Sequence, residues 1–374
     1  MPVSADVQTP ACRTPRDFAG PGRLLARALA AILALGCEGS VHGESSAPGP
    51  SYADLAHGAV HGVVRIHGTE LTQHLIHLWE DGFLKKQPLI RYSDYTVPAW
   101  FSGLCAGTAD LAVTGHDAWR SDLKAFESVY GYDPLEILFA TGGFDKRKGN
   151  TPGVIIFVNK DNPITGLTLE QLDFILGAQR TGGWRGTQWV TDCARGPEKN
   201  IRSWGQLGLT GEWADKPIAL YGIDATLSGW SGLIQKVVFH GGDKWNPAIR
   251  EFVRGGAETP ADVQLVDGVA HDRYGLGFSF MRVVEANPGV RAVALDGGGG
   301  RIAPTEATFR DRSYPLVSGV YIYLNREPGK PIPPRLKEFL TYILSREGQQ
   351  DIAADGMYLP LPPQVLAAER RKLE

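Results

Sequence analysis

Residues 153 to 177 read GVIIFVNKDNPITGLTLEQLDFILG, and this stretch decides the fold class. Its first part, Val154 to Val158, is a run of mostly β-branched residues, which is typical of a strand buried on both faces. An Asn-Pro pair ends the run, and apolar residues then recur at helical spacing. Thr168, with Gln171 three residues further on, forms a helix-capping pattern, and Gly177 ends the helix. The stretch therefore predicts a strand, a turn and a helix.

Strands and helices alternate in the same way on both sides of this unit. The expected strands are Val63 to Ile66, Leu89 to Tyr92, Ala109 to Val113, Leu135 to Ala140, Ile218 to Tyr221, Gly275 to Met281, Val290 to Leu295 and Val317 to Leu324. The expected helices include Glu70 to Asp81, Val97 to Ala106, Ser231 to Phe239, Pro247 to Arg254 and Pro334 to Asp355. Such alternation predicts mostly parallel sheets, whose ligand sites lie at the carboxyl ends of the strands.

The wording of two segments resembles a known family. The strand ending VNKDNPI and the helix GLTLEQL resemble the entry into the second lobe of the phosphate-binding proteins of ABC transporters, a branch of the type II periplasmic solute-binding proteins. Tyr314-Pro315-Leu316, Glu347-Gly348-Gln349 and the segment Gly356 to Leu361 follow that family's closing pattern in order. The resemblance implies an α/β fold of two lobes, each a mixed, mostly parallel sheet flanked by helices, with a ligand cleft between the lobes.

The resemblance also sets the expected domain boundaries. We expect residues 1–43 to be a signal peptide or lipoprotein leader and residues 44–60 a linker. Lobe 1 is expected to comprise residues 61–150 and 275–374, and lobe 2 residues 151–274. The apolar run Leu24 to Leu35 and the following Cys37 leave three alternatives: lipid attachment at Cys37, cleavage after Gly43, or a retained N-terminal helix. We expect a periplasmic or other extracytoplasmic location.

Composition limits the classes of function. Hydrophobic residues make up 43% of the 374 residues and charged residues 21%, as in a soluble globular protein. The net charge of −3 gives no support for nucleic-acid binding. Cys105 and Cys193 fall in different expected lobes, where a disulfide would prevent the lobes from moving, so we expect both thiols to be free. We expect a monomer whose partners are a small-molecule ligand and an ABC transporter permease or membrane sensor.

The resemblance implies which loops hold the ligand. Phosphate-binding relatives use helix N-terminal amides, hydroxyl side chains, one arginine and one carboxylate, which together match the acceptors and the proton of hydrogen phosphate. The residues of this chain at or beside those positions are Gly68, Thr69, Thr72, Ser93, Asp94, Thr114, His116, Asp117, Thr226, Ser228 and Gly229. Thr69 also suits a plain helix cap, so both roles stay open for it.

Three departures from the family pattern leave two classes of ligand open. Ile223 stands where the family has an arginine, and Gly115 stands where phosphate binders of one type have an aspartate. The loop that matches the family's second hydroxyl loop contains Pro98, which has no N–H to donate. The basic run Lys146 to Lys148 offers replacement cations, although a solvated loop explains it as well. Phosphate or a related oxyanion and a less charged organic solute are therefore both retained as ligands.

Metal binding and catalysis are the alternatives of a different class. His74, His77 and Glu80 follow one another at steps of three on an expected helix, a spacing that can place ligands on one face, but a solvated face is the simpler interpretation. No nucleophile elbow, P-loop or dinucleotide fingerprint occurs, so a hydrolase is only a minor alternative. We expect no enzyme, no cofactor and no metal. The tryptophan-rich segment 180–213 is expected to pack, with a ligand wall as its alternative.

Overall fold

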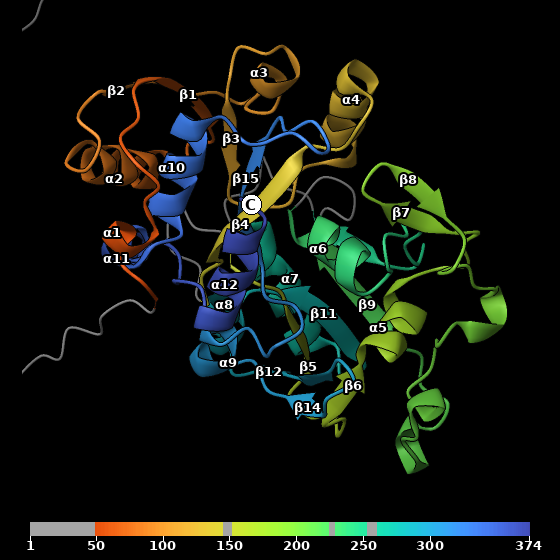
Figure 1. The fold of residues 1–374 in the computed structure, drawn as a ribbon. Helices are drawn as coiled ribbons and strands as arrows, with labels where there is room; N and C mark the ends of the chain where they lie inside the picture. Colours follow the sequence, from red (N-terminus) through yellow and green to blue (C-terminus); the bar gives the residue numbers. More distant parts are fainter. Residues whose placement is uncertain (1–48, 145–151, 224–228, 253–259) are drawn as a thin grey trace, which may run out of the picture. The chain divides into compact units, whose positions relative to one another are not determined.

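The architecture consists of two five-stranded sheets, each with its own hydrophobic core (Figure 1). A computed structural model describes residues 49–144, 152–223, 229–252 and 260–374. The first sheet has the strand order β2-β1-β3-β15-β4, and the second the order β10-β9-β11-β5-β12. In each, the first three strands run parallel, and the fourth is antiparallel to its two neighbours. The expected mixed, mostly parallel sheets are confirmed.

The first sheet and its helices are built from both ends of the described chain. Their bounds are α1 (Tyr52–Leu55), β1 (Gly62–Gly68), α2 (Gln73–Leu84), β2 (Ile90–Thr96), α3 (Ser102–Cys105), β3 (Leu111–Thr114), α4 (Arg120–Tyr130), β4 (Leu135–Thr141), β15 (Gly319–Leu324), α10 (Pro334–Ile343), α11 (Arg346–Asp355) and α12 (Pro363–Arg371). The helix expected from Pro334 to Asp355 is two helices, because Ser345 caps a new one by accepting from the Gly348 amide.

The second sheet and the elements around it come from the middle of the chain. They are β5 (Ile155–Asn159), β6 (Gly166–Thr168), α5 (Leu169–Leu176), β7 (Gly183–Arg185), β8 (Gln188–Val190), the 3-10 turns η1 (Pro197–Lys199), η2 (Gly205–Leu207) and η3 (Gly211–Trp213), β9 (Ala219–Ile223), α6 (Gly229–Val237), β10 (Arg250–Phe252), α7 (Ala261–His271), β11 (Gly275–Ser279), α8 (Met281–Glu285), β12 (Val290–Ala292), β13 (Ala294–Asp296), β14 (Arg301–Ile302) and α9 (Glu306–Arg310). β14, β13 and β6 form a further small sheet.

The strand, turn and helix unit forms as the sequence predicts. All five residues of β5 are buried, as expected of a strand covered on both faces. At the start of α5, the Gln171 amide donates to Thr168 Oγ1 at 3.0 Å, and the Thr168 amide donates to Gln171 Oε1 at 2.9 Å. This reciprocal capping satisfies two backbone donors that the first helical turn leaves without partners.

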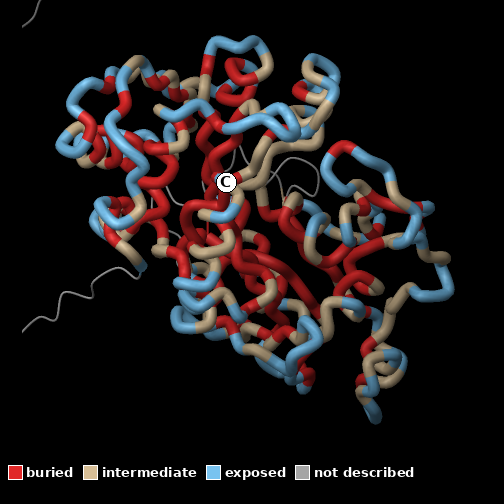
Figure 2. The backbone as a smooth tube through the Cα atoms, in the orientation of Figure 1, coloured by how far each residue is buried: buried red, intermediate tan, exposed pale blue. Residues whose placement is uncertain are grey.

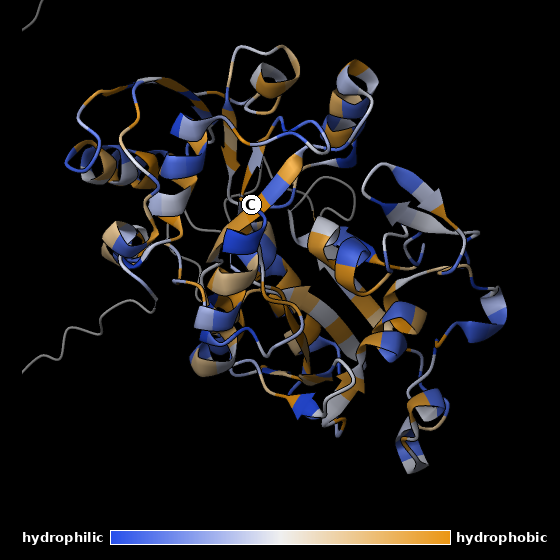
Figure 3. Cartoon of the chain, viewed as in Figure 1, coloured by the Kyte–Doolittle hydropathy of each residue, from blue (hydrophilic) through white to orange (hydrophobic). Residues whose placement is uncertain are grey.

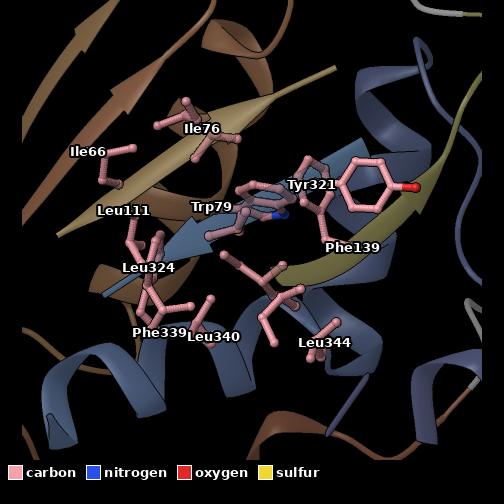
Figure 4. Packing of buried hydrophobic residues seen from close by; sticks show 14 of the residues in the cluster. Ile66, Ile76, Trp79, Leu111, Phe139, Tyr321, Leu324, Phe339, Leu340 and Leu344 are labelled. Atoms are coloured by element: carbon pink, nitrogen blue, oxygen red, sulfur yellow. The ribbon is translucent and has the colours of Figure 1, made fainter. Parts of the chain in front are cut away.

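Apolar side chains from strands and helices fill the first core. Helix α2 buries Leu75, Ile76, Trp79 and Phe83, which recur on one helical face. Trp79 packs edge-on against Phe139, with ring centroids 4.8 Å apart, and its indole N–H donates to the Gly348 carbonyl. Figure 4 shows Ile76, Trp79 and Phe139 packed against the sheet, with the hydroxyl of Tyr321 directed away from the other labelled side chains. Figure 2 shows that the strands of both sheets are largely buried.

The expected boundary at residue 275 differs from the packing. β11 lies in the middle of the second sheet, where Leu276 is paired with Val158 of β5, and buried residues as far as Val317 belong to the second core. The chain therefore re-enters the first sheet only at Gly319. The expected helix Pro247 to Arg254 is also wrong, because Arg250–Phe252 is a strand paired with β9.

The structure also bears on the expectations for the cysteines, the tryptophan-rich segment and the N-terminal leader and linker. Cys105 and Cys193 are free, as expected. Trp204 and Trp213 are buried and contact each other edge-on, which agrees with packing, whereas Trp184 and Trp189 pair on the β7–β8 hairpin. The expected leader, residues 1–43, lies outside the described residues, and part of the expected linker forms α1. None of the helices in the described ranges has the length and apolarity needed to cross a membrane.

Candidate functional site

Three threonines meet at one edge of the first sheet. Gly68 is opposite Val113 in the parallel pair β1–β3, so Thr69 and Thr114 both lie at the carboxyl ends of these strands. β15 lies between β3 and β4, with Tyr321 opposite Thr114 and Gly319 opposite Thr141. Thr141, the last residue of β4, therefore lies at the same edge as Thr114. The register thus gathers three hydroxyl side chains at the edge where parallel sheets bind ligands.

The loop after β1 leaves one of its two hydroxyl groups without a partner. A Cβ at Gly68 would lie 2.6 Å from Ile76 Cδ1, so a larger residue in this turn would force the Ile76 side chain to shift. The Thr72 hydroxyl donates to the Thr69 carbonyl at 3.1 Å and is fully buried. Thr69 Oγ1 is also buried but has no hydrogen-bond partner among the described residues. Thr72 therefore serves the turn itself, whereas Thr69 has a free hydroxyl to offer.

The loop after β3 holds its histidine rigidly. Thr114 is fully buried, and its Oγ1 lies 3.4 Å from the His116 amide. His116 Nδ1 lies 2.6 Å from the Asp117 carbonyl, which fixes Nδ1 as the protonated, donating nitrogen. The imidazole also packs against Trp119 and Trp100. His116 thus holds the loop that carries Asp117 through its Nδ1, and its expected ligand role stays a prediction.

Asp117 meets a cation from the second half of the molecule. Its Oδ1 forms an ion pair with Lys236 Nζ of α6, and this ammonium also lies 5.2 Å from the centroid of the Tyr321 ring. Burial alone would lower the pKa of Lys236, but Tyr321 and Asp117 outweigh it and raise the pKa, so the ammonium stays charged. α6 shows both hydrophobic and hydrophilic residues in Figure 3, and it buries Leu233 and Ile234 in the second core.

A second cation reaches the same edge. Arg312 Nη1 donates to Thr141 Oγ1 at 3.0 Å and to the Ser318 carbonyl at 3.2 Å, and it makes no ion pair with a described carboxylate. Its backbone φ of 61° lies in the left-handed region, which disfavours residues with a side chain. Burial lowers the pKa of the guanidinium, although Tyr321 and Asp117 act in the opposite direction. A guanidinium has so high a pKa that it remains charged.

The structure places the other expected residues differently. β2 extends to Thr96, beyond the expected end at Tyr92, so Ser93 and Asp94 lie inside a strand instead of a loop. Because side chains alternate along a strand, Asp94 faces α2, where its Oδ2 lies 3.1 Å from His77 Nε2. Asp94 thus contacts helix α2, and its expected ligand role stays a prediction.

The fourth expected loop is described only in part. Thr226 and Ser228 lie outside the described residues, as do Lys146 to Lys148. Gly229 begins α6, and a Cβ there would lie 3.2 Å from the Cβ of His116, so the two halves approach each other closely at this point. Ile223 is buried at the end of β9.

Further contacts join the two halves beside Asp117 and Lys236. Arg120 Nη1 lies 3.2 Å from Asp243 Oδ2, and its guanidinium stacks 5.0 Å from the Trp184 ring centroid. Sequence reasoning missed Arg120, Lys236 and Arg312. The only sequence signal for Arg312 was the Arg-Asp-Arg run just before Ser313. That run points to the site only once it is known that the chain returns to the first sheet at Gly319.

The molecule has two similar sheets, and cations from the second half reach the hydroxyl-lined edge of the first sheet. This arrangement defines a two-lobe α/β binding protein. The chain belongs to the PBP superfamily, whose domain model matches residues 150–347. It is 31% identical over 304 residues to the phosphate-binding protein PstS of Pseudomonas aeruginosa, covering 80% of this chain and 83% of that protein. Protein SphX of Synechococcus elongatus is 23% identical over 276 residues, covering 73% of this chain and 69% of that protein.

Solved structures are also similar to the chain. An ABC-type phosphate transport receptor from Vibrio cholerae has 18% identity and a TM-score of 0.45, covering 79% of this chain and 99% of its own. PstS from Borrelia burgdorferi has 14% identity and a TM-score of 0.48, covering 80% of this chain and 99% of its own. Family membership rests on the domain model and on the 31% identity.

Proposed function

We propose that this protein binds phosphate outside the cytoplasm and delivers it to an ABC-type uptake system. The observation that carries the proposal is the meeting of Arg312, Lys236 and Asp117 beside the hydroxyl-lined edge of the first sheet. It is supported by the identity of 31% to a protein named for phosphate binding. A binding role without catalysis agrees with that relationship.

Each group in the site matches a part of hydrogen phosphate. Arg312 offers charged N–H donors that suit the oxygens of a tetrahedral anion, and it replaces the arginine that the family has where this chain has Ile223. Lys236 adds a second positive charge, and the unpartnered Thr69 hydroxyl adds a neutral donor. The remaining lone pairs of Asp117 can accept the proton that hydrogen phosphate carries and sulfate lacks. Two cations at the edge favour this anion over an uncharged organic solute.

Closure of the two lobes around the ligand would tell a membrane partner that ligand is bound. We assign residues 49–142 and 318–374 to one lobe and residues 152–317 to the other, following the two cores. The two crossings lie side by side, because the Gly142 amide donates to the Ser318 carbonyl at 3.0 Å. A ligand held by groups from both lobes stabilises the closed form, in which Asp117 meets Lys236. The closed surface is what a permease or membrane sensor would recognise.

Export and attachment complete the proposal. A protein that serves an uptake system acts outside the cytoplasm, in agreement with the expected leader at residues 1–43. Lipid attachment at Cys37 would hold it near its permease, and mass spectrometry of the mature N-terminus distinguishes this from cleavage after Gly43. The protein is proposed to act as a monomer, which size-exclusion chromatography with light scattering tests.

Calorimetric titration tests the proposed ligand. Protein unfolded and refolded to remove endogenous ligand is titrated with phosphate near neutral pH, with sulfate as the control anion. We expect one phosphate per chain and no heat with sulfate. If neither anion binds while the refolded protein melts like the native one, phosphate is the wrong ligand, and the compound that copurifies with the native protein has to be identified by mass spectrometry. A less charged organic solute is the outcome that the departures at Ile223 and Pro98 leave open.

A further inference from the structure

A histidine and two carboxylates converge between α2 and β2, in a cluster that the proposed anion site does not use. His77 and Glu80 lie three residues apart on α2, and Asp94 projects from β2 towards them. One ligand atom from each residue lies within 4.8 Å of the other two, and His77 Nε2 is 3.1 Å from Asp94 Oδ2. A helix and a strand therefore present one nitrogen and two oxygen ligands to a common point.

Glu80 is the member of the cluster that the surrounding protein does not satisfy. The residue is only 8% exposed, its Oε1 is fully buried, and this oxygen has no hydrogen-bond partner among the described residues. The hydroxyl of Tyr92 in β2 is likewise buried without a described partner. A buried carboxylate without a partner is costly, so native proteins pair such groups with cations or donors.

The charges around Glu80 increase this demand for a cation. Asp94 and Asp81 add negative charge close to the buried carboxyl group of Glu80. His77 is half exposed and contacts Asp94, and no Lys or Arg side chain forms an ion pair with any of the three residues in the described chain. A divalent cation would neutralise both carboxylates at once.

We propose that His77, Glu80 and Asp94 bind a first-row divalent transition metal, with Zn²⁺ as the best match. One imidazole and two carboxylates suit Zn²⁺, and the partly exposed side of the cluster leaves space for a water as fourth ligand. Bonds of about 2.1 Å to a tetrahedral ion place ligand atoms about 3.4 Å apart. The observed spacing reaches this with small side-chain rotations.

The site differs from the histidine pattern that the sequence suggests. His74, one turn earlier on α2, does not join the cluster, because its Nδ1 lies 2.6 Å from Asp355 Oδ1 of α11. Asp94 takes the third position instead, which was not evident from the spacing of residues along one helix. The metal would fasten α2 to β2, two elements that otherwise meet here through partly exposed side chains.

Zinc titration of the mature protein tests the proposal. After treatment with EDTA and removal of phosphate, the protein is titrated with Zn²⁺ by calorimetry, and Co²⁺ is added separately to record its visible absorption. We expect one Zn²⁺ per chain, a higher melting temperature with Zn²⁺, and the intense absorption of four-coordinate Co²⁺. Mg²⁺, which prefers six oxygen ligands, is the control ion and should leave the melting temperature unchanged.

Variants assign the binding to the three residues. Glu80→Gln and His77→Gln should each weaken Zn²⁺ binding at least tenfold, whereas His74→Gln should leave it unchanged because His74 belongs to the pair with Asp355. His77 is exposed enough that its variant should fold even if Glu80→Gln does not, and circular dichroism checks both. Absence of Zn²⁺ binding in the folded wild type, or binding lost in His74→Gln but kept in His77→Gln, overturns the proposal.

Discussion

The two sheets have the same pattern of strand directions but different carboxyl edges. The first sheet ends in Thr69, Thr114 and Thr141, which are hydroxyl side chains. At the corresponding edge of the second sheet, β9 ends in Ile223 and β10 in Phe252, both apolar, whereas β11 ends in Ser279. The second half contributes charge instead, through Lys236 of α6 and through Arg312, which follows α9. The first half therefore supplies most of the hydroxyl groups of the candidate site, and the second half supplies its two cations.

Removal of the guanidinium tests the charged side of this comparison and should have the largest effect. We expect Arg312→Gln to weaken phosphate binding about 100-fold, because charge-assisted hydrogen bonds are worth about 1.5–3 kcal/mol each. Arg310→Gln is the matched control, since Arg310 is exposed and pairs with Glu306 on its own helix. Calorimetry measures both variants. Equal affinities for the two would remove Arg312 from the site.

Neutralising Asp117 tests whether the first half also supplies the acceptor for the proton of hydrogen phosphate. Asp117→Asn keeps the shape but replaces one acceptor oxygen with a donor, so phosphate affinity should fall about tenfold while sulfate binding becomes detectable. The ion pair with Lys236 is lost in the same variant. Lys236→Gln serves as the comparison, because it removes that ion pair but keeps the carboxylate and should still reject sulfate. Unchanged selectivity in Asp117→Asn would contradict the assigned role.

Thr69→Val isolates one hydroxyl of the first edge. The Thr69 hydroxyl has no described partner, so valine should not lower the stability of the protein, whereas phosphate affinity should fall about fivefold. The opposite pattern, lower stability with unchanged affinity, would mean that Thr69 is only a structural residue of the turn. Thermal melting and calorimetry on the same preparation separate the two outcomes. Ser279→Ala, at the end of β11, removes the corresponding hydroxyl from the second sheet and should change affinity less.

The smallest expected effect is a pH dependence that belongs to the first half alone. Burial raises the pKa of Asp351 to about 6, above the usual carboxyl value, although the hydrogen bond from the Tyr342 hydroxyl partly opposes this. The folded state therefore holds the proton more tightly than the unfolded state, and stability contributed by the protonated form is lost as pH rises from about 4 to about 6.

Asp351→Asn checks this sign. The difference in free energy of unfolding between wild type and variant should shift by about 1 kcal/mol against the wild type between pH 4 and pH 7, after allowance for partial exposure. Urea unfolding at several pH values measures it. A difference that is independent of pH would show that Asp351 titrates normally in the folded protein.

Local signals in the sequence predict the fold well where neighbouring residues decide the structure. Thr168 and Gln171 determine the start of α5 by their own hydrogen bonds, and the apolar run at Ile155–Asn159 forms a fully buried strand. The return of the chain at Gly319 was not predictable in this way, because β11 pairs with β5 across more than a hundred residues. Periodicity does not identify the strand with which a strand pairs.

The candidate site was predictable in its first-sheet part only. Gly68, Thr69 and Thr114 follow strands whose ends the pattern indicates, so their common edge could be inferred. The position of Asp94 was not predictable, because β2 ends four residues later than expected and the alternation of side chains then turns Asp94 towards α2. Lys236 and Arg312 reach the edge through tertiary packing, which the spacing of residues along the chain does not encode.

The left-handed backbone conformation of Arg312 creates a conflict between the thermal stability of the protein and its affinity for the ligand. A residue with a side chain is strained at a φ of 61°, and glycine would relieve this strain. A selection for heat resistance alone favours Arg312→Gly wherever the relief of strain outweighs the lost hydrogen bonds to Thr141 Oγ1 and the Ser318 carbonyl, and such variants have lost the guanidinium. Engineers who use this chain as a phosphate reagent should screen for binding and thermal stability together. A substitution of Arg312 that raises thermal stability also removes the guanidinium proposed to bind phosphate.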